Sequence, residues 1–400
     1  MNYLTKHFNH RRISPQHRIA VPLVLVKELP KGAIPSIWQE RIYRYEAENK
    51  KIVVYSEETV NELARNDKKY FIKGVNFFVE SKCWVSSRAE TDSNRQRVSE
   101  LNAETLDILQ EVSSSLSLHN DDFLVDGVVI TTYEEVIERR PRYFPVAVNR
   151  QTGEIVWTHN DYSGVSHKAA TDKILVLISF ECQVTALNIH TGELLWQVTP
   201  LDFDILTEEE QGWWREKPGT AQNSLHIYNN QVIIGLPGRK LVALDVNTGE
   251  TLWHYRHDMS FIQTVVDWRG RLYSLSSEIY SRETGRYIEE RPMLTIFDLN
   301  TRQIIHQHEI TTKPKKLAKL LAPCHQADVT ETHYIGLTVY GLLIAVNLET
   351  GKIDWQYNLE GNSTHGIGLF VCNNRVYAQV LRGFDPHNFI FEGEGGYIQD

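Results

Sequence analysis

A phrase of eleven residues recurs in this chain and constrains its fold more than any other feature. Its four clear copies read Ala-x-[Asn/Asp]-x-x-Thr-Gly-[Glu/Lys]-x-x-Trp and occupy residues 147–157, 186–196, 243–253 and 345–355. The Asn or Asp can accept hydrogen bonds from the backbone amides of the turn that it opens. The glycine tolerates the positive φ of a tight hairpin turn. The phrase therefore predicts a β-hairpin that ends on a large ring, which is suited to packing between neighbouring sheets.

Three weaker copies extend the series. They are placed at Glu46, Asn102 and Asp298, and none of them keeps the tryptophan. In the copy at Asp298, Arg302 takes the place of the glycine and His306 takes the place of the tryptophan. Across all seven copies, the spacing runs from 39 residues (149 to 188) to 57 residues (188 to 245). Such a period is typical of the four-stranded blades of a propeller.

The repeats predict an all-β fold: a seven-bladed β-propeller of four-stranded antiparallel blades. Two further strands, at 368–371 and 376–379, follow Trp355 without a phrase of their own, and the copy at 42–55 has no clear strands before it. We expect these parts to form one blade, closed by pairing of N- and C-terminal strands, so that no sheet edge separates the first and last blades. The expected division is an N-terminal segment (1–40), the propeller (41–380) and a C-terminal tail (381–400).

The phrase resembles the tryptophan-docking repeat of quinoprotein-type β-propellers, over roughly residues 42–380. That family includes pyrroloquinoline-quinone dehydrogenases and non-enzymatic relatives such as an outer-membrane-assembly lipoprotein. For the dehydrogenases, the resemblance implies eight blades, a calcium site, an Asp base and, in many, adjacent cysteines. This chain has no adjacent cysteines, and we expect seven blades, no cofactor, no metal site and no catalytic residues. The structural docking residues are expected to be Trp157, Trp196, Trp253 and Trp355.

Composition narrows the partners and the compartment. The 400 residues, 42% of them hydrophobic, can bury a large core, and one propeller can use all of it. A formal net charge of -9 argues against nucleic-acid binding, which depends on clustered Lys and Arg. The four cysteines show no paired spacing, which indicates free thiols in a reducing compartment; they are Cys83, Cys182, Cys324 and Cys372.

The N-terminal stretch has some features of a signal peptide. Residues 1–18 are basic and lack acids, and an apolar run follows at 19–26. That run is short, contains Pro22 and meets Lys27 and Glu28 without a small-residue cleavage site. No run is long enough to cross a bilayer as a helix. We therefore interpret 19–26 as a strand and expect a cytoplasmic protein that does not bind membranes.

Clusters of histidine offer no complete metal site. His306 and His308 would share one face of a strand because side chains alternate, but two ligands do not complete a zinc site. Asp328 and His333 lie near Cys324-His325 without a spacing that supports a metal or a nucleophile. We expect structural roles for these residues, and for His119 with Asp121 and Asp122.

The insertion at 199–222 is the strongest candidate for a binding surface. It separates Trp196 from the next expected strand and is acidic, with six carboxylates against Arg215 and Lys217. Long loops on propeller faces commonly bind partners, although such a loop can also cap a neighbouring blade with its own side chains. The candidate partner-binding residues are Asp202, Asp204, Glu208, Glu209, Glu210, Trp213 and Trp214.

These observations favour a monomeric, non-enzymatic β-propeller that binds another protein. One version is a bacterial immunity or inhibitor protein whose acidic face covers a basic toxin. Two alternatives come from the resemblance: a quinone- or metal-dependent oxidoreductase, and an exported assembly scaffold. A bound quinone or metal would favour the enzyme, and the start of the mature chain would identify an exported scaffold.

Overall fold

The structure of the chain is a computed structural model. It describes residues 19–29, 31, 35–38, 41–46, 48–66, 71–79, 82–88, 96–114, 123–125, 127–137, 140–149, 152, 154–159, 165–179, 183–199, 208, 224–236, 240–256, 264–267, 269–280, 287–310, 324–338, 341–360, 368–382 and 385–395. No helix in these ranges combines the length and the apolar character that crossing a membrane requires.

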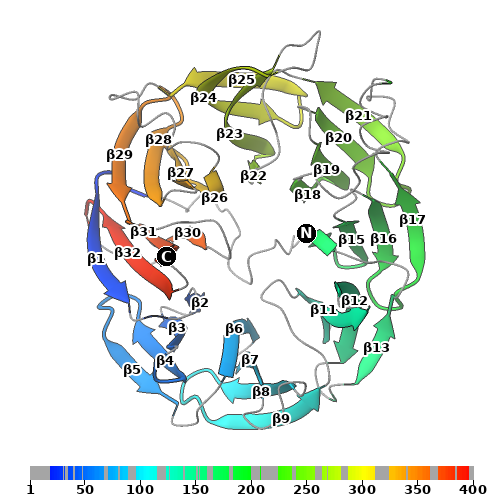
Figure 1. The fold of residues 1–400 in the computed structure, drawn as a ribbon, viewed down its shortest axis with the longest axis vertical. Coiled ribbons are helices and arrows are strands. Elements are labelled where there is room, and N and C mark those ends of the chain that lie inside the picture. Colours follow the sequence, from blue (N-terminus) through cyan, green and yellow to red (C-terminus); the bar gives the residue numbers. More distant parts are fainter. Residues whose placement is uncertain are drawn as a thin grey trace.

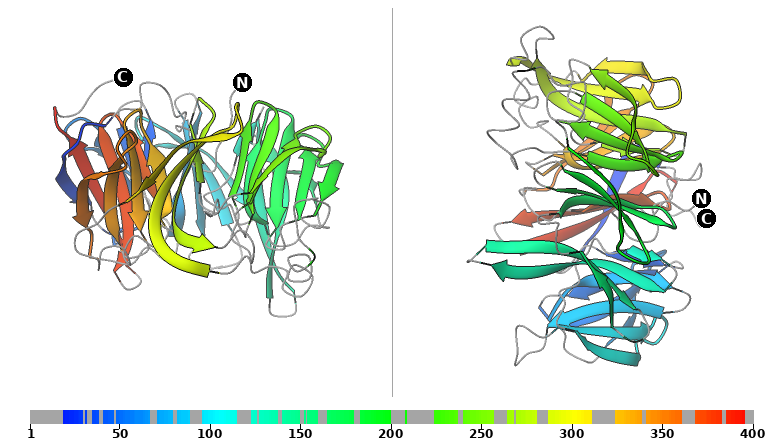
Figure 2. Two further views of the ribbon diagram at one scale, coloured as in Figure 1. Left: turned by 90° about the horizontal axis from the view of Figure 1, so that it is seen from above. Right: turned by 90° about the vertical axis from the view of Figure 1, so that its right-hand side faces the viewer.

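The described strands form eight four-stranded antiparallel sheets, which stand as blades around a central axis (Figure 1). Side views show the blades next to one another around this ring (Figure 2). In seven blades the strands follow one another from the axis outward. The eighth blade combines strands from both ends of the chain.

The first four blades take the chain from residue 36 to residue 198. Blade 1 contains β2 (Ser36–Trp38), β3 (Arg41–Glu46), β4 (Lys51–Ser56) and β5 (Glu62–Arg65). Blade 2 contains β6 (Phe71–Val79), β7 (Lys82–Arg88), β8 (Gln96–Asn102) and β9 (Ile108–Ser114). Blade 3 contains β10 (Phe123–Val125), β11 (Val128–Ile137), β12 (Arg140–Asn149) and β13 (Ile155–Thr158). Blade 4 contains β14 (Val165–Ala170), β15 (Ile174–Ser179), β16 (Val184–Asn188) and β17 (Leu194–Val198).

The remaining blades complete the ring. Blade 5 contains β18 (Ser224–Tyr228), β19 (Gln231–Leu236), β20 (Lys240–Asp245) and β21 (Thr251–Arg256). Blade 6 contains β22 (Thr264–Val266), β23 (Arg271–Tyr280), β24 (Tyr287–Asp298) and β25 (Gln303–Glu309). Blade 7 contains β26 (Cys324–Val329), β27 (His333–Thr338), β28 (Leu342–Asn347) and β29 (Ile353–Asn358). Blade 8 contains β30 (Leu369–Cys372), β31 (Arg375–Arg382), β32 (Asp385–Gly393) and β1 (Leu23–Leu29).

The all-β propeller and its closure by strands from both chain ends are as predicted, but the number of blades is eight instead of seven. The closing strand is β1, which pairs with β32 from Leu23 opposite Gly393 to Leu29 opposite Asn388. The strands at 42–55 were expected to complete this blade, and they belong instead to blade 1. Blade 8 therefore extends beyond the expected propeller range of 41–380 at both ends.

The phrase undercounts the blades because it marks the hairpin between the third and fourth strands. In blade 8 these two strands are β32 and β1, which lie at opposite ends of the chain, so no hairpin can join them. The copy in blade 1 was also misplaced. Its turn starts at Ser56 rather than Glu46, and Val60 takes the glycine position with a φ of 55°.

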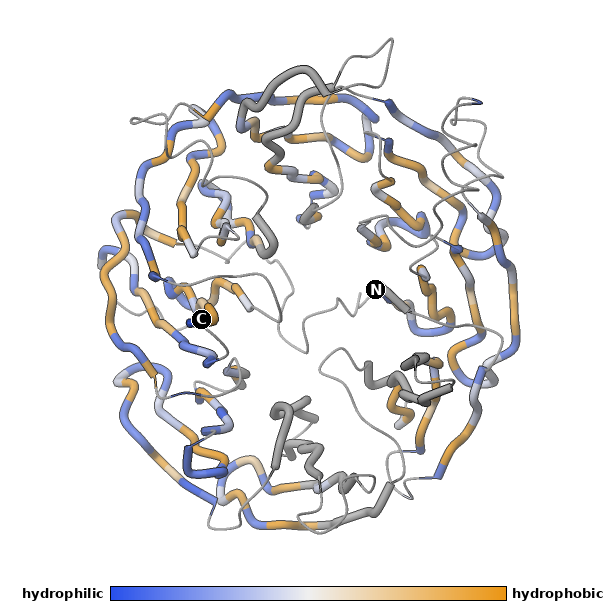
Figure 3. Tube along the Cα trace, viewed as in Figure 1, coloured by the Kyte–Doolittle hydropathy of each residue, from blue (hydrophilic) through white to orange (hydrophobic). Residues whose placement is uncertain are grey.

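The core lies between the blades. The second and third strands of a blade are covered on both faces by neighbouring blades, so they carry almost continuous apolar runs. All six residues of β15 are buried, as are all six of β27. Outer strands differ: the pattern in β17 is two exposed residues, then buried Trp196. Figure 3 shows apolar residues on both the middle and the outer strands.

The clear copies in blades 4, 5 and 7 form the turn that their residues predict. In blade 4, the backbone amides of His190 and Thr191 donate to Oδ1 of Asn188 at 3.0 and 3.2 Å, and the amide of Gly192 donates to its carbonyl at 2.8 Å. Gly192 has a φ of 71°. The same contacts form at Asp245, where the amide of Gly249 donates to the carbonyl at 2.9 Å.

The tryptophan of one blade packs on the glycine of the next. A Cβ at Gly192 would lie 2.6 Å from Trp157, and one at Gly249 would lie 2.7 Å from Trp196, so both rings rest directly on the glycine backbone. The indole nitrogens donate into the same turns, from Trp157 to the carbonyl of Ile189 (3.0 Å) and from Trp196 to that of Val246 (2.9 Å). Within its own sheet, each ring lies opposite the alanine of its phrase.

Where the phrase is incomplete, another contact replaces this packing. Arg302 stands in the glycine place of blade 6, and its guanidinium lies over the Trp253 ring at 5.8 Å, within cation–π range. Gly351 of blade 7 packs on His308, so the expected docking role of His306 is wrong.

Trp355 faces blade 8, which has no phrase turn. Its ring meets Phe391 edge-on at 5.4 Å and is only partly buried, whereas Trp157, Trp196 and Trp253 are 7–8% exposed.

Blade 8 is joined to its neighbours through polar contacts at the turn between β30 and β31. Oδ1 of Asn374 accepts from the amide of Ala20 at 2.7 Å, and Nδ2 donates to the carbonyl of Gly393 at 3.2 Å. Arg375 is 2% exposed and donates to the carbonyls of Glu57 and Glu58 in blade 1. Its charge is balanced by Glu392. These contacts connect the first and last parts of the chain.

Substitution of Gly249 by alanine should destabilise the protein more than the same change at Gly127. Both glycines have a positive φ, 75° and 79°, so each alanine costs about 1–2 kcal/mol in backbone strain. Only Gly249 has a ring against it, whereas Gly127 has nothing within 4 Å. The collision should add about 1–3 kcal/mol, measured as the difference in unfolding free energy by urea denaturation. Equal losses for the two variants would contradict the docking role of the ring.

Asn374→Gly should lower the free energy of unfolding by about 1–2 kcal/mol, because the amide of Ala20 loses its acceptor. Glycine keeps the positive φ of 59° at this position, so the variant removes only the side chain. Asn230→Gly is the matched control: it has a φ of 60° in the equivalent turn of blade 5, and its side chain is exposed. If Asn230→Gly were as destabilising as Asn374→Gly in thermal and urea unfolding, the closing contact would have no special weight.

Candidate protein-binding surface

The strand ends divide the ring into two faces. Because neighbouring strands in a blade are antiparallel, the turns after the first and third strands lie at one end of each sheet, which we call the tight-turn face. The second-to-third connections and the links between blades leave from the opposite end. The predicted binding insertion joins β17 to β18, and both strand ends lie at this opposite end.

The candidate residues of that insertion fall mostly outside the described ranges. Glu208 is described, and its side chain is exposed. The other six lie outside the described residues: Asp202, Asp204, Glu209, Glu210, Trp213 and Trp214. Their role as a binding surface stays a prediction.

A different surface stands out on the outer strands next to the tight-turn face. Pairs of large apolar residues are exposed at the start of three consecutive outer strands, β9, β13 and β17, and single ones on β5 and β21. We call this set the apolar rim. Its members are 38–55% exposed: Leu63, Ile108, Leu109, Ile155, Val156, Leu194, Leu195 and Leu252.

A β-bulge explains why two consecutive residues face outward. In blade 3, Ile155 lies opposite Val148 and Trp157 lies opposite Ala147, so Val156 is an extra residue without a partner. The same shift occurs in blades 1, 2, 4 and 5. A bulge bends its strand and re-aims the side chains. The two residues before the tryptophan position are consequently exposed, while the tryptophan itself turns inward.

The rim could have been noticed in the sequence. An edge strand has one face toward the neighbouring blade, and regular alternation would bury only every second residue. Leu194 and Leu195 directly precede Trp196, so not all three can face inward. The sequence analysis predicted a strand at these residues but did not predict whether their side chains face the neighbouring blade or the outside of the ring.

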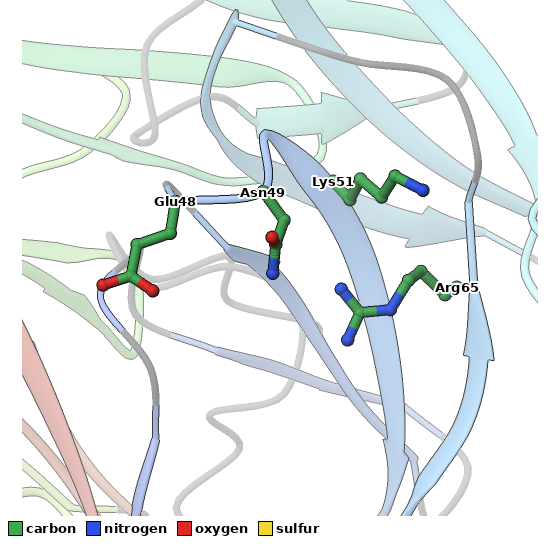
Figure 4. A pocket seen from close by; sticks show the side chains of 4 residues that line it. All are labelled: Glu48, Asn49, Lys51 and Arg65. Atoms are coloured by element: carbon green, nitrogen blue, oxygen red, sulfur yellow. The ribbon is translucent and has the colours of Figure 1, made fainter.

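A polar hollow in blade 1 was also not predicted. It has a volume of about 500 Å³ and is lined by Glu48, Asn49, Lys51 and Arg65 (Figure 4). Arg65 is held by Glu62, at 2.7 and 2.9 Å, and by Glu46 at 2.8 Å. Its guanidinium thus already binds two carboxylates from its own blade.

Glu46 behind this hollow is 2% exposed and supports the fold. It accepts hydrogen bonds from the Tyr55 hydroxyl, from Asn49 (3.0 Å) and from Arg65. Burial alone would raise the pKa of Glu46, but these hydrogen bonds together hold it below the ordinary value. Burial raises the pKa of Tyr55 well above its ordinary value, and Glu46 adds to this. The carboxylate stays ionised and the phenol neutral around neutral pH, so this pair is not poised for proton transfer.

The suspected metal residues also make structural contacts. Asp328 is 1% exposed and accepts from the amide of Val371 at 2.8 Å, which ties blade 7 to blade 8. Nε2 of His333 lies 3.1 Å from Asp354. The rings of His306 and His308 stack at 5.6 Å. Within the described ranges, no group of three His, Cys, Asp or Glu side chains is arranged to hold a metal ion.

Comparison with known proteins agrees with the repeat. A family model described as PQQ_2, outer membrane protein assembly factor BamB, matches residues 136–283. Comparison with curated proteins finds no match.

Several solved structures share the fold. BamB from Moraxella catarrhalis has a TM-score of 0.62 at 13% identity, over 95% of this chain and 100% of that chain. The quinohemoprotein alcohol dehydrogenase ADHIIG from Pseudomonas putida HK5 also has a TM-score of 0.62, at 12% identity, over 99% of this chain and 80% of that chain. A europium-containing methanol dehydrogenase has a TM-score of 0.56 at 11% identity, over 97% of this chain and 96% of that chain. The chain thus shares the β-propeller fold of these structures, and its residues 136–283 match the BamB family model.

Proposed function

We propose that this chain is a non-enzymatic propeller that binds another protein. The observation that carries the proposal is the apolar rim, which leaves large apolar side chains exposed on five consecutive blades. Apolar residues scattered singly over a surface need no partner, but gathered exposed ones commonly mark a site of protein–protein contact. Here the exposed apolar residues recur at equivalent positions of neighbouring blades, in adjacent pairs on blades 2, 3 and 4.

The comparisons support binding in general terms. The matching family model is that of an assembly factor, and assembly involves contact with other proteins. The same fold also serves the alcohol and methanol dehydrogenases, so the fold does not choose between binding and catalysis. The buried carboxylates of the described residues are engaged within the fold, and this favours binding; they are Glu46, Glu57, Asp267 and Asp328.

The finer features of the proposal come from the sequence. A net charge of -9 favours a basic partner, as a toxin covered by an immunity or inhibitor protein would be. The separated cysteines favour a cytoplasmic location, which is part of this proposal. We propose a monomeric protein without a resident quinone or metal.

Protein purified natively without chelator should contain no quinone absorbance and no stoichiometric metal. It should also co-purify with a protein at a fixed molar ratio, measured by absorption spectroscopy, elemental analysis and light scattering. A quinone, or one calcium or zinc ion per chain, would overturn the proposal and favour an oxidoreductase. Refolded protein incubated with calcium and quinone is the control. Adventitious uptake would give a variable ratio of ligand to chain, whereas a resident cofactor would give a fixed one.

The insertion at 199–222 is a second candidate contact for the same partner. Replacing Glu208, Glu209 and Glu210 by Gln should slow association with a basic partner, because carboxylates steer the encounter, and Trp213→Ala should speed dissociation. Surface plasmon resonance with the co-purifying protein measures both rates. If both variants bind like the parent and melt at the same temperature, the insertion is not part of the contact.

A further inference from the structure

We propose that the apolar rim of blades 2 to 5 binds a basic amphipathic segment of the partner protein. This proposal rests on the proposed function and adds the location of the contact and the chemistry of the partner. It starts from the residue before each exposed apolar pair. That residue is an exposed acid in four consecutive blades: Asp107, Glu154, Glu193 and Glu250.

Acid and apolar residues thus repeat as triplets around the ring. Asp107-Ile108-Leu109, Glu154-Ile155-Val156 and Glu193-Leu194-Leu195 expose all three side chains, and Glu250-Thr251-Leu252 exposes the acid and both following residues. The hydrogen bonds of the first two acids come from a threonine of their own turn, at 2.6 Å for Asp107 and 3.3 Å for Glu154. No lysine or arginine within the described ranges forms a salt bridge with any of the four acids. Their negative charge is therefore free to act on a partner.

The surface has boundaries, because the pattern ends at blade 6. The same positions there hold Gln303, Ile304 and Ile305, and both isoleucines are partly buried. In blade 7, Lys352 takes the acidic position and Asp354 takes the second apolar position. Charge and exposure change together, so the triplets form a limited patch rather than a feature of every blade.

The negative charge of this patch determines which kind of ligand it can bind. A row of carboxylates repels nucleic acid and anionic lipid headgroups, and it repels the same row on a second copy of the chain. A polypeptide with Lys or Arg next to apolar side chains matches both components, because its cations can meet the carboxylates while its apolar groups cover the rim. The apolar contacts should set the dissociation rate and the acids the association rate.

A synthetic peptide of alternating lysine and leucine tests this inference with the full-length protein. We expect it to bind, measured by fluorescence anisotropy, and a lysine–serine or a glutamate–leucine peptide to bind about tenfold more weakly or not at all. Leu194→Ser combined with Leu195→Ser should weaken binding of the lysine–leucine peptide about tenfold. Glu154→Gln, Glu193→Gln and Glu250→Gln together should reduce its salt dependence.

Matched controls lie outside the patch. Val24 is 65% exposed on the outer strand of blade 8, and Glu349 is exposed in the phrase turn of blade 7. Val24→Ser and Glu349→Gln should leave peptide affinity within about twofold of the parent, because neither adjoins the triplets. Melting temperatures show that each variant is folded. If the control variants lose as much affinity as the rim variants, or the rim variants lose none, the inference is overturned.

Co-purification of the native partner distinguishes a failure of this inference from a failure of the proposed function. If the partner still co-purifies with the folded rim variants, the chain remains a binding propeller and the rim assignment fails. If the native protein instead holds a quinone and no protein partner, the proposed function fails whatever the peptide does.

Discussion

The contact between the tryptophan of one blade and the glycine of the next organises this molecule. The rings of Trp157 and Trp196 each cover a positive-φ glycine, donate a hydrogen bond into the same turn and lie opposite an alanine in their own sheet. Three requirements thus coincide in one short sequence: a small residue, a residue free to take a left-handed conformation, and a ring with a polar edge. The contact joins blade 3 to blade 4 and blade 4 to blade 5, and related contacts take its place at other joints.

The contact tolerates loss of either member if another attraction replaces it. Arg302 lies over the Trp253 ring, and Trp355 meets Phe391 edge-on. At the joint between blades 8 and 1, where Val60 stands in the glycine position, Arg375 donates to the carbonyls of Glu57 and Glu58. Cation–π, aromatic and charge-assisted contacts therefore fill the same structural role at different joints.

The sequence predicted the fold well where the phrase is intact. It predicted the fold poorly where other residue types occupy the phrase positions. Asn and Thr at fixed offsets from glycine were enough to predict the turns and the propeller. The turn at Ser56 and Val60 was not predicted, because valine rarely adopts a positive φ. Val60 nevertheless adopts one here. The eighth blade was missed because its third and fourth strands are not neighbours in sequence. The apolar rim was missed although Leu194 and Leu195 directly precede Trp196, because which of these side chains faces outward depends on the register shift of a bulge. The insertion at 199–222 was predicted from its charge and length, and within it the structure describes Thr199 and Glu208.

The shared blade 8 has a consequence for how the chain reaches its native state. Ala20 and Asn374 lie 354 positions apart and must meet before the ring is closed. The entropy of closing such a loop grows only with the logarithm of its length, so the equilibrium penalty is modest. The rate is affected more, because non-local pairing slows folding. During synthesis β1 leaves the ribosome long before its partner β32, so a strand rich in leucine and valine, LVLVKEL, stays unpaired until the intervening blades have been made. Such an unpaired apolar strand can associate with other chains, so the closing strand is the part of this fold most exposed to aggregation before the ring is complete.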